Sequence, residues 1–246
     1  MEKINISELE KITLELYYDI LEKDGIKNEK RIEEIKARLN EISKLEVKQK
    51  VKNYILKTFG LDEKKLKKYR VSSSFDTIID SMYFLKGLGI DVKKAVNRLP
   101  QLLTYSIKYM QERVEYLNSL GIDVRKVVNN LPALLEYSIK YMQERVDYLN
   151  SLGINVSKVV NKLPQLLELS VENNLKPKFK YLIEEVGLGI EDIETTPCLL
   201  TLSLEKRIKP RWEYIKSLGK DYVDKRKIIR CLILKEEYFK EYLMKI

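Results

Sequence analysis

Apolar and polar residues in the middle of the chain recur with the spacing of helices. Met142, Val146 and Leu149 lie at positions i, i+4 and i+7, which places them on one face of a helix. Ser138 stands before this stripe as a natural N-cap, and Gly153 stands after it, where a left-handed residue ends a helix. The pattern therefore predicts a long helix that begins at Ser138 and ends about one residue before Gly153.

Two shorter helices complete the predicted unit. Pro132 has a fixed φ and lacks an N–H, so a short helix can open there with Leu134 and Leu135 facing inward. Residues 156–163 hold another apolar cluster, in too little length for more than a short third helix. Because no apolar–polar alternation typical of strands competes with this reading, each unit is predicted to contain three helices.

The unit is repeated along the chain. Pro100, Pro132 and Pro164 are 32 residues apart, and Pro197 follows after 33. Residues 100–131 and 132–163 are identical at 26 of 32 positions. Serines and glycines extend the register outward at Ser74, Ser106, Ser138, Ser170, Ser203, Gly25, Gly60, Gly89, Gly121, Gly153, Gly187 and Gly219. This spacing indicates about seven units.

A unit of about 32 residues is too small to bury its own core, so neighbouring units must stack. The expected fold is all-α, an α-solenoid of about seven three-helix repeats. We expect degenerate N-terminal helical repeats and a cap in residues 1–67, the regular repeats in 68–230, and a C-terminal helical cap in 231–246.

Composition excludes most catalytic and metal chemistry. The 246 residues include no histidine and only two cysteines, Cys198 and Cys231, so histidine bases, histidine-ligated metals and four-cysteine sites cannot form within one chain. These two cysteines are 33 residues apart in one repeat column and could lie near each other, but we expect two reduced, buried thiols. Glu184 and Glu185 could form a carboxylate pair, but adjacent helical residues point about 100° apart. The chain is therefore predicted to be no enzyme and to hold no cofactor and no metal.

Several segments resemble mTERF repeats, those of the mitochondrial transcription termination factor family. The resemblance rests on Leu-Pro-x-Leu-Leu-x-x-Ser followed by Tyr-Leu-x-x-Leu-Gly-Ile, and above all on the segments Leu169–Leu182 and Leu202–Ile215, which contain Leu-Lys-Pro-Lys-Phe and Ile-Lys-Pro-Arg-Trp. It is close over about residues 68–230 and weak over the first 60. It implies a curved superhelix of three-helix repeats that binds double-stranded DNA, or in some members RNA, along a basic inner groove without catalysis.

The net charge of +9, from 46 basic and 37 acidic residues, is unevenly distributed. Two sets of cations recur at fixed repeat positions. The arginine column, near the start of the long helix, is Arg113, Arg145, Lys178 and Arg211. The lysine column, after the glycine, is Lys94, Lys126 and Lys158. Stacking would turn each column into a stripe on one side of the molecule, which suits a phosphate backbone. The alternative is ordinary solvated cations, neutralised by neighbours such as Glu112 and Glu144.

The C-terminal basic cluster is the densest group of cations. It contains Lys206, Arg207, Lys209, Arg211, Lys225, Arg226, Lys227 and Arg230. It is read either as part of the nucleic-acid site or as a charged end cap. The repeated pairs Tyr105/Tyr109 and Tyr137/Tyr141 could stack on unpaired bases, although packing between units is the preferred interpretation.

These features predict a nucleic-acid-binding protein, with double-stranded DNA held along a basic groove to modulate transcription or replication. The alternatives are an RNA-binding member of the same family and a non-catalytic protein-binding scaffold. The net negative charge of the repeat at residues 164–196 favours the scaffold. We expect a monomer without a membrane partner. Acidic residues within the first ten positions do not suit a presequence, so a cytoplasmic location is expected unless a presequence has been removed. Abundant Lys, Glu, Ile and Leu is also typical of thermophile proteins.

Overall fold

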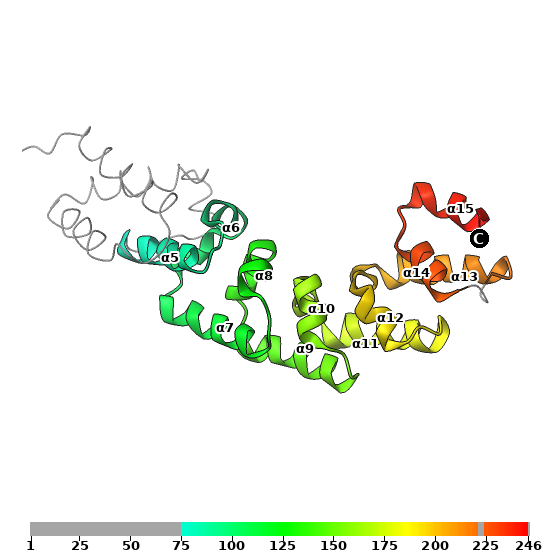
Figure 1. The fold of residues 1–246 in the computed structure, drawn as a ribbon, viewed down its shortest axis with the longest axis horizontal. Coiled ribbons are helices and arrows are strands. Elements are labelled where there is room, and N and C mark those ends of the chain that lie inside the picture. Colours follow the sequence, from blue (N-terminus) through cyan, green and yellow to red (C-terminus); the bar gives the residue numbers. More distant parts are fainter. Residues whose placement is uncertain (1–74, 221–223, 246) are drawn as a thin grey trace, which may run out of the picture. The chain divides into compact units, whose positions relative to one another are not determined.

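The computed structural model describes residues 75–220 and 224–245, and every regular element in these ranges is a helix (Figure 1). The predicted all-α class is confirmed. The predicted N-terminal repeats of residues 1–67, with Gly25, Gly60 and Ser74, lie outside the described residues. The number of seven repeats stays a prediction.

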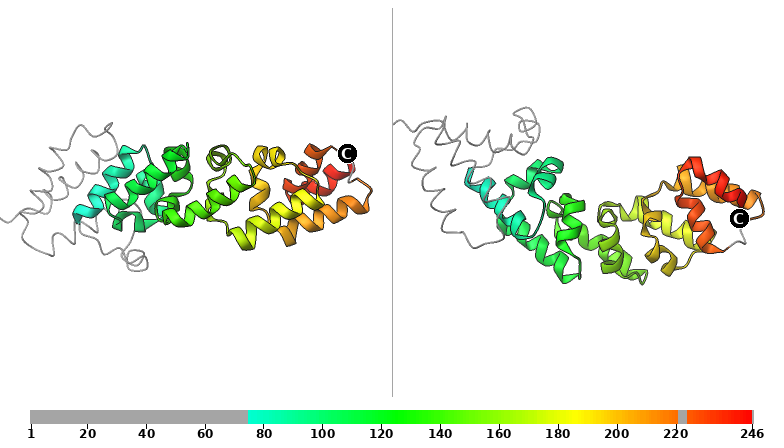
Figure 2. Two further views of the ribbon diagram at one scale, coloured as in Figure 1. Left: turned by 90° about the horizontal axis from the view of Figure 1, so that it is seen from below. Right: turned by 45° about the horizontal axis from the view of Figure 1, so that its top comes forward.

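The chain divides into two compact units, residues 1–117 with 124–136, and residues 118–123 with 137–246. The first unit contains α5 (Phe75–Gly87), α6 (Val92–Arg98), η1 (Pro100–Thr104), most of α7 (Ile107–Ser119), α8 (Val124–Asn130) and η2 (Pro132–Leu135). The second contains α9 (Ile139–Ser151), α10 (Val156–Lys162), η3 (Pro164–Glu168), η4 (Val171–Leu175), α11 (Lys176–Lys180), η5 (Tyr181–Glu185), α12 (Ile190–Thr195), η6 (Pro197–Thr201), η7 (Leu204–Ile208), α13 (Lys209–Ser217), α14 (Lys225–Ile233) and α15 (Glu236–Lys245). Within the second unit, α10 and α12 lie side by side (Figure 2).

One repeat consists of a long helix, a short helix and a proline-initiated turn of 3₁₀ helix. In α9 the Ser138 hydroxyl accepts a hydrogen bond from the Tyr141 N–H at 3.1 Å, which confirms the predicted N-cap. Gly153 follows with φ of +75°, the left-handed conformation that glycine adopts at least cost. The short helix α10 then begins with its own cap, because the Asn155 side chain accepts from the Lys158 N–H at 2.9 Å.

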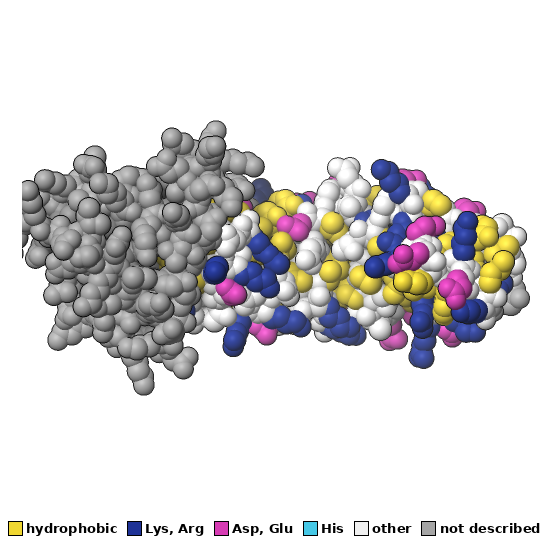
Figure 3. Space-filling model, turned by 90° about the horizontal axis from the view of Figure 1, so that it is seen from above, with side chains coloured by type: hydrophobic (Ala, Val, Ile, Leu, Met, Phe, Trp, Pro, Cys, Tyr) yellow, Lys and Arg dark blue, Asp and Glu magenta, His cyan; other side chains and the backbone are white. Residues whose placement is uncertain are grey.

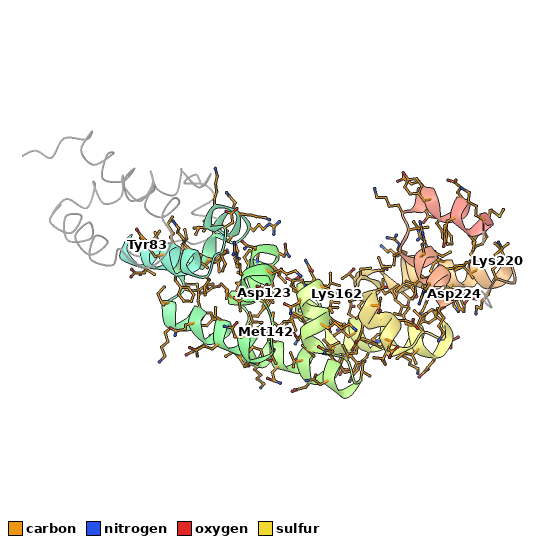
Figure 4. All side chains as sticks on the ribbon, in the orientation of Figure 1. Tyr83, Asp123, Met142, Lys162, Lys220 and Asp224 are labelled. Atoms are coloured by element: carbon orange, nitrogen blue, oxygen red, sulfur yellow. The ribbon has the colours of Figure 1, made fainter. Side chains whose placement is uncertain are left out.

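The predicted apolar stripe forms the core of each repeat. Met142 and Leu149 are fully buried, and Val146 is nearly so. Met142 is labelled on α9 in Figure 4. Pro164 opens a short element as expected, but η3 is 3₁₀ rather than α-helical, and it buries Leu166 and Leu167. These leucines pack in the space that the long and short helices leave between them.

Later repeats carry extra residues in their long helices as π-helical turns. Ser138 and Arg145 are seven residues apart, whereas Ser170 and Lys178, at the same repeat positions, are eight apart. The extra residue lies in η4, a π-helix in which the Leu175 N–H donates to the Ser170 carbonyl five residues back. A π-turn widens the helix locally and so keeps the residues on either side in register. Residues 204–208 use the same device before Arg211.

Side chains of the short helices fasten consecutive repeats together. Asn161 of α10 accepts from the Asp123 N–H at 2.8 Å and donates to the Gly121 carbonyl at 3.2 Å. Asn129 of α8 makes the matching bonds to Asp91 and Gly89 at 2.8 and 3.4 Å. In both repeats the asparagine amide therefore accepts from one backbone N–H and donates to one backbone carbonyl in the loop of the preceding repeat.

Cations close the ends of the short helices. Lys162 reaches from α10 to the carbonyls of Glu194 and Thr195 at the end of α12, at 3.3 and 3.4 Å (Figure 4). Arg98 bonds in the same way to the carbonyls that end α8. In both cases the positive charge interacts favourably with the partial negative charge of a helix C-terminus. Among the described residues, no helix is both long and apolar enough to cross a membrane.

Candidate nucleic-acid interface

The arginine column is buried. Arg113, Arg145, Lys178 and Arg211 are 7, 6, 4 and 4% exposed. The prediction that these side chains emerge together on one surface is therefore wrong. The physical reason is that the main chain around them supplies carbonyl acceptors, which a cation satisfies inside the fold.

Arg145 illustrates this use. Its Nε donates to the Leu169 carbonyl at 3.2 Å, and its Nη1 donates to the Tyr141 carbonyl at 2.8 Å. The guanidinium carbon lies 3.4 Å from the centre of the Tyr141 ring, and Glu144 completes the site with an ion pair at 2.8 Å. Arg113 repeats the arrangement with Tyr109 and Glu112. The arginine therefore joins elements of the fold, and its head group is already occupied.

Lys178 and Arg211 fill the same position in the later repeats. The Nζ of Lys178 donates to the Leu200 carbonyl at 2.5 Å and to Asn174 at 2.7 Å, and burial lowers the pKa of this lysine. The Nη1 of Arg211 donates to the carbonyls of Cys231 and Leu232 at the end of α14. Each member of the column thus has a structural role within its own unit.

The lysine column is exposed, as a phosphate-binding set requires. Lys94, Lys126 and Lys158 lie on the outer faces of α6, α8 and α10. Lys158 also pairs with Glu194 of α12 at 2.8 Å, although its side chain remains 46% exposed. These lysines lie on short helices that also expose other cations.

The short helices α6, α8, α10 and α14 expose cations and carry no acidic residue within their bounds. We call these exposed side chains the short-helix cations: Lys93, Lys94, Arg98, Arg125, Lys126, Lys158, Lys162, Lys225, Arg226, Lys227 and Arg230. Sequence reasoning missed Lys93, Arg98, Arg125 and Lys162. The pattern of valine and alanine in each seven-residue helix distinguishes buried from exposed positions, and these four cations fall at exposed ones.

The long helices carry the acidic residues instead. On α7 and α9 the exposed carboxylates are Glu112, Glu115, Glu144 and Asp147, against the exposed lysines Lys108 and Lys140. In the repeats that contain α7 and α9, exposed cations therefore predominate on the short helices and exposed carboxylates on the long helices. A chain with evenly mixed charge would show no such separation.

One short helix is an exception. α12 exposes Glu191 and half-exposes Asp192, and its Glu194 stands where Asn129 and Asn161 stand in earlier repeats. Glu194 accepts from the Asn155 N–H at 2.6 Å and from Lys158, and these bonds lower the pKa of its carboxyl. In the space-filling view, Asp and Glu side chains lie among the Lys and Arg side chains toward the C-terminal part of the chain (Figure 3).

The C-terminal basic cluster separates onto different elements. Arg226, Lys227 and Arg230 are exposed on α14, and the Arg230 guanidinium carbon lies 4.8 Å from the centre of the Tyr242 ring. Arg207 is half-buried against the carbonyls that end α14. Two other members lie on the long-helix segment, where Lys206 is exposed and Lys209 pairs with Glu205 at 2.5 Å.

The repeated tyrosines pack between repeats. The rings of Tyr105 and Tyr109 stack with centres 5.1 Å apart, and the Tyr109 hydroxyl donates to the Glu136 carbonyl at 2.7 Å. Tyr141 donates to the Glu168 carbonyl in the same way. The preferred packing interpretation is confirmed. Burial, followed by the charge of Glu136, raises the pKa of Tyr105 to about 12.

Both cysteines are free thiols; Cys231 is buried, as expected, whereas Cys198 is only half-buried. Within residues 75–220 and 224–245, no group of three or more Cys, Asp or Glu side chains is arranged to hold a metal ion.

Comparison with known families agrees with the repeat geometry. The family model described as mTERF matches residues 6–240 of the chain. No curated protein matches the chain significantly.

Proposed function

Because the chain belongs to the mTERF family, and this membership indicates nucleic-acid binding, we propose that it binds double-stranded DNA through the short-helix cations. The observation that carries the proposal is the distribution of charge: exposed cations recur without acidic neighbours on α6, α8, α10 and α14, whereas exposed carboxylates outnumber exposed cations on α7 and α9. Within each unit, cations repeated on successive short helices can contact successive phosphates without reading bases.

The choice of duplex over single strands rests on the aromatic residues. Proteins that bind single strands combine cations with exposed rings on which bases stack. The short helices α6, α8, α10, α12 and α14 contain no aromatic residue, and Tyr109 and Tyr141 are used in packing between repeats. The short-helix cations therefore offer charge without stacking platforms. Occupying a duplex in this way would modulate transcription or replication by blocking the template.

The test compares nucleic acids at two salt concentrations. Fluorescence anisotropy would measure binding of the full chain to duplex DNA, single-stranded DNA and RNA of one sequence. Duplex DNA should bind tightest, and with about six phosphate contacts its affinity should fall about a thousandfold between about 50 and 200 mM salt. Tighter binding to RNA would assign the chain to the RNA-binding alternative.

A protein-binding function is the second candidate, and one cleft favours it. A cleft of about 580 Å³ lies between α12 and α14, lined by Glu191 and Asp192 of α12, by Arg226 and Arg230 of α14, and by the apolar Ile229. A lining that combines both charges with apolar side chains suits a peptide better than a phosphate backbone. Failure of the full chain to bind any of the three nucleic acids would favour this function.

A further inference from the structure

A polar pocket of about 390 Å³ lies in the last repeat, where η6 ends and η7 and α15 begin. Its polar lining consists of Thr201, Ser203, Lys206, Arg207, Arg211 and Glu236. Three cations therefore face one carboxylate. The Glu236 side chain is 78% exposed and pairs with Nη2 of Arg211 at 2.7 Å, so this carboxylate lies at the solvent edge of the pocket.

The preceding repeat shows how unusual this set of charges is. There Asn173 and Asn174 stand three and four residues after the capping Ser170, where Lys206 and Arg207 stand after Ser203. The Asn174 side chain accepts a hydrogen bond from the buried Lys178. In the last repeat, a second guanidinium occupies the position of that acceptor.

The last repeat also contains a buried donor without a partner. Arg211 is only 4% exposed, and its Nε has no hydrogen-bond partner among the described residues. A buried unpaired donor is costly unless a ligand or water satisfies it. Burial and the neighbouring charge of Arg211 also lower the pKa of Arg207.

Two further donors line the pocket. Lys206 is exposed, and its ammonium has no hydrogen-bond or ion-pair partner within the described part of the chain. The Ser203 oxygen accepts from the Lys206 N–H at 3.1 Å, which leaves its O–H to donate. An anion in the pocket could receive hydrogen bonds from Lys206 and Ser203, with the guanidinium groups of Arg207 and Arg211 also in the lining.

We propose that this pocket binds a phosphate monoester dianion. Three cations and one carboxylate give the lining a net charge of +2, which a monoester dianion neutralises. Charge-assisted hydrogen bonds from guanidinium and ammonium groups are the strong interactions that proteins use for phosphate. The site does not depend on the short-helix cations, so it can exist whether or not those residues bind DNA.

Isothermal titration calorimetry of the full chain with inorganic phosphate tests the site. The variant K206N/R207N restores the residues of the preceding repeat and should weaken phosphate binding at least about tenfold, the effect of losing one strong hydrogen bond. The control K176N/K180N removes two exposed cations from α11 and should bind phosphate as the wild type does. E236Q removes the competing carboxylate and should tighten binding.

The outcome can be read even if one variant is unstable. If K206N/R207N unfolds, the single variant K206N replaces it, because the Lys206 ammonium makes no contact that the fold requires. Absence of phosphate binding by the wild type, or an equal loss in the K176N/K180N control, would overturn the proposal.

Two oligonucleotides distinguish the sources of the phosphate. Tighter binding of a 5′-phosphorylated strand than of its 5′-hydroxyl form would identify a nucleic-acid end as the ligand. Equal binding of the two strands, together with retained inorganic phosphate binding, would identify a small phosphorylated molecule. Since inorganic phosphate is titrated without DNA, failure of the proposed DNA function would leave this result unaffected.

Discussion

Arg145 shows how a single cation is used inside this fold. Its guanidinium stacks on Tyr141, donates to two main-chain carbonyls and is 6% exposed. Arg145 lies three residues after Met142 and four before Leu149, within the same apolar stripe. This spacing is a sign of burial that the sequence already contained. Its charge suggested a position on the surface, since the sequence alone does not show that main-chain carbonyls lie within reach of the guanidinium.

Replacing Arg145 with glutamate should destabilise the protein by about 3–5 kcal/mol, because a buried negative charge would then face unpaired carbonyls. Urea unfolding followed by circular dichroism measures this change. The control Lys140→Glu alters an exposed residue of the same helix and should change the free energy of unfolding by less than about 0.5 kcal/mol. Equal effects of the two substitutions would contradict a structural role for Arg145.

Glu194 should make stability depend on pH. Its hydrogen bonds with the Asn155 N–H and Lys158 lower its folded-state pKa, so the stability that it contributes is present above the unfolded pKa of about 4.3 and is lost as the pH falls through the folded value. Glu194→Gln should therefore be less stable than the wild type at pH 7, and this difference should shrink at pH 3. Urea unfolding at both pH values measures it.

Glu191→Gln, on the exposed face of α12, is the matched control for Glu194→Gln. Its stability relative to the wild type should not change in this way with pH. A pH-independent deficit in Glu194→Gln would show that packing, and not the carboxylate, stabilises this contact.

Among the helices, the most informative is the segment from 171 to 185, in which α11 lies between two π-helical turns. The sequence showed that this repeat is longer than its neighbours, through the spacing of Pro164 and Pro197. It could not show where the extra residues go, because a loop and a helix can both accept an insertion. Pro177, which has no N–H to donate to an α-helical carbonyl, suits a widened helix.

Deleting Asn173 and replacing Pro177 with glutamate would give the segment from Ser170 to Lys178 the seven-residue spacing of Ser138 and Arg145 in α9. We expect the variant to fold with a loss of stability on the order of 1 kcal/mol, because the residues on both sides of the turn keep their faces. Deleting Gln143 from α9 should abolish cooperative unfolding, since every later residue of the helix rotates by about 100°. Thermal melting followed by circular dichroism compares the two deletion variants. Equal losses of stability would contradict the interpretation of the π-turn as an inserted residue.

At the scale of the whole molecule, the repeat period made the fold predictable from the sequence, whereas the candidate site could be predicted only in part. Prolines, capping serines and glycines recur at nearly fixed positions, and each has a local physical role that the structure retains. The lysine column was found because it recurs strictly. Arg125 and Lys162 were missed because their positions are taken by Ser157 and Asn130 in the neighbouring repeat, so no unbroken column exists.

The salt dependence of duplex DNA binding tests the central claim, that the short-helix cations form the interface. The plot of log affinity against log salt should become shallower by about two for K93Q/K94Q on α6, and by the same amount for R226Q/K227Q on α14, since each phosphate contact contributes about 0.9. The control K108Q/K140Q, on α7 and α9, should keep the wild-type slope. A shallower slope in that control, with unchanged slopes in the two short-helix variants, would place the interface on the long helices and contradict the account.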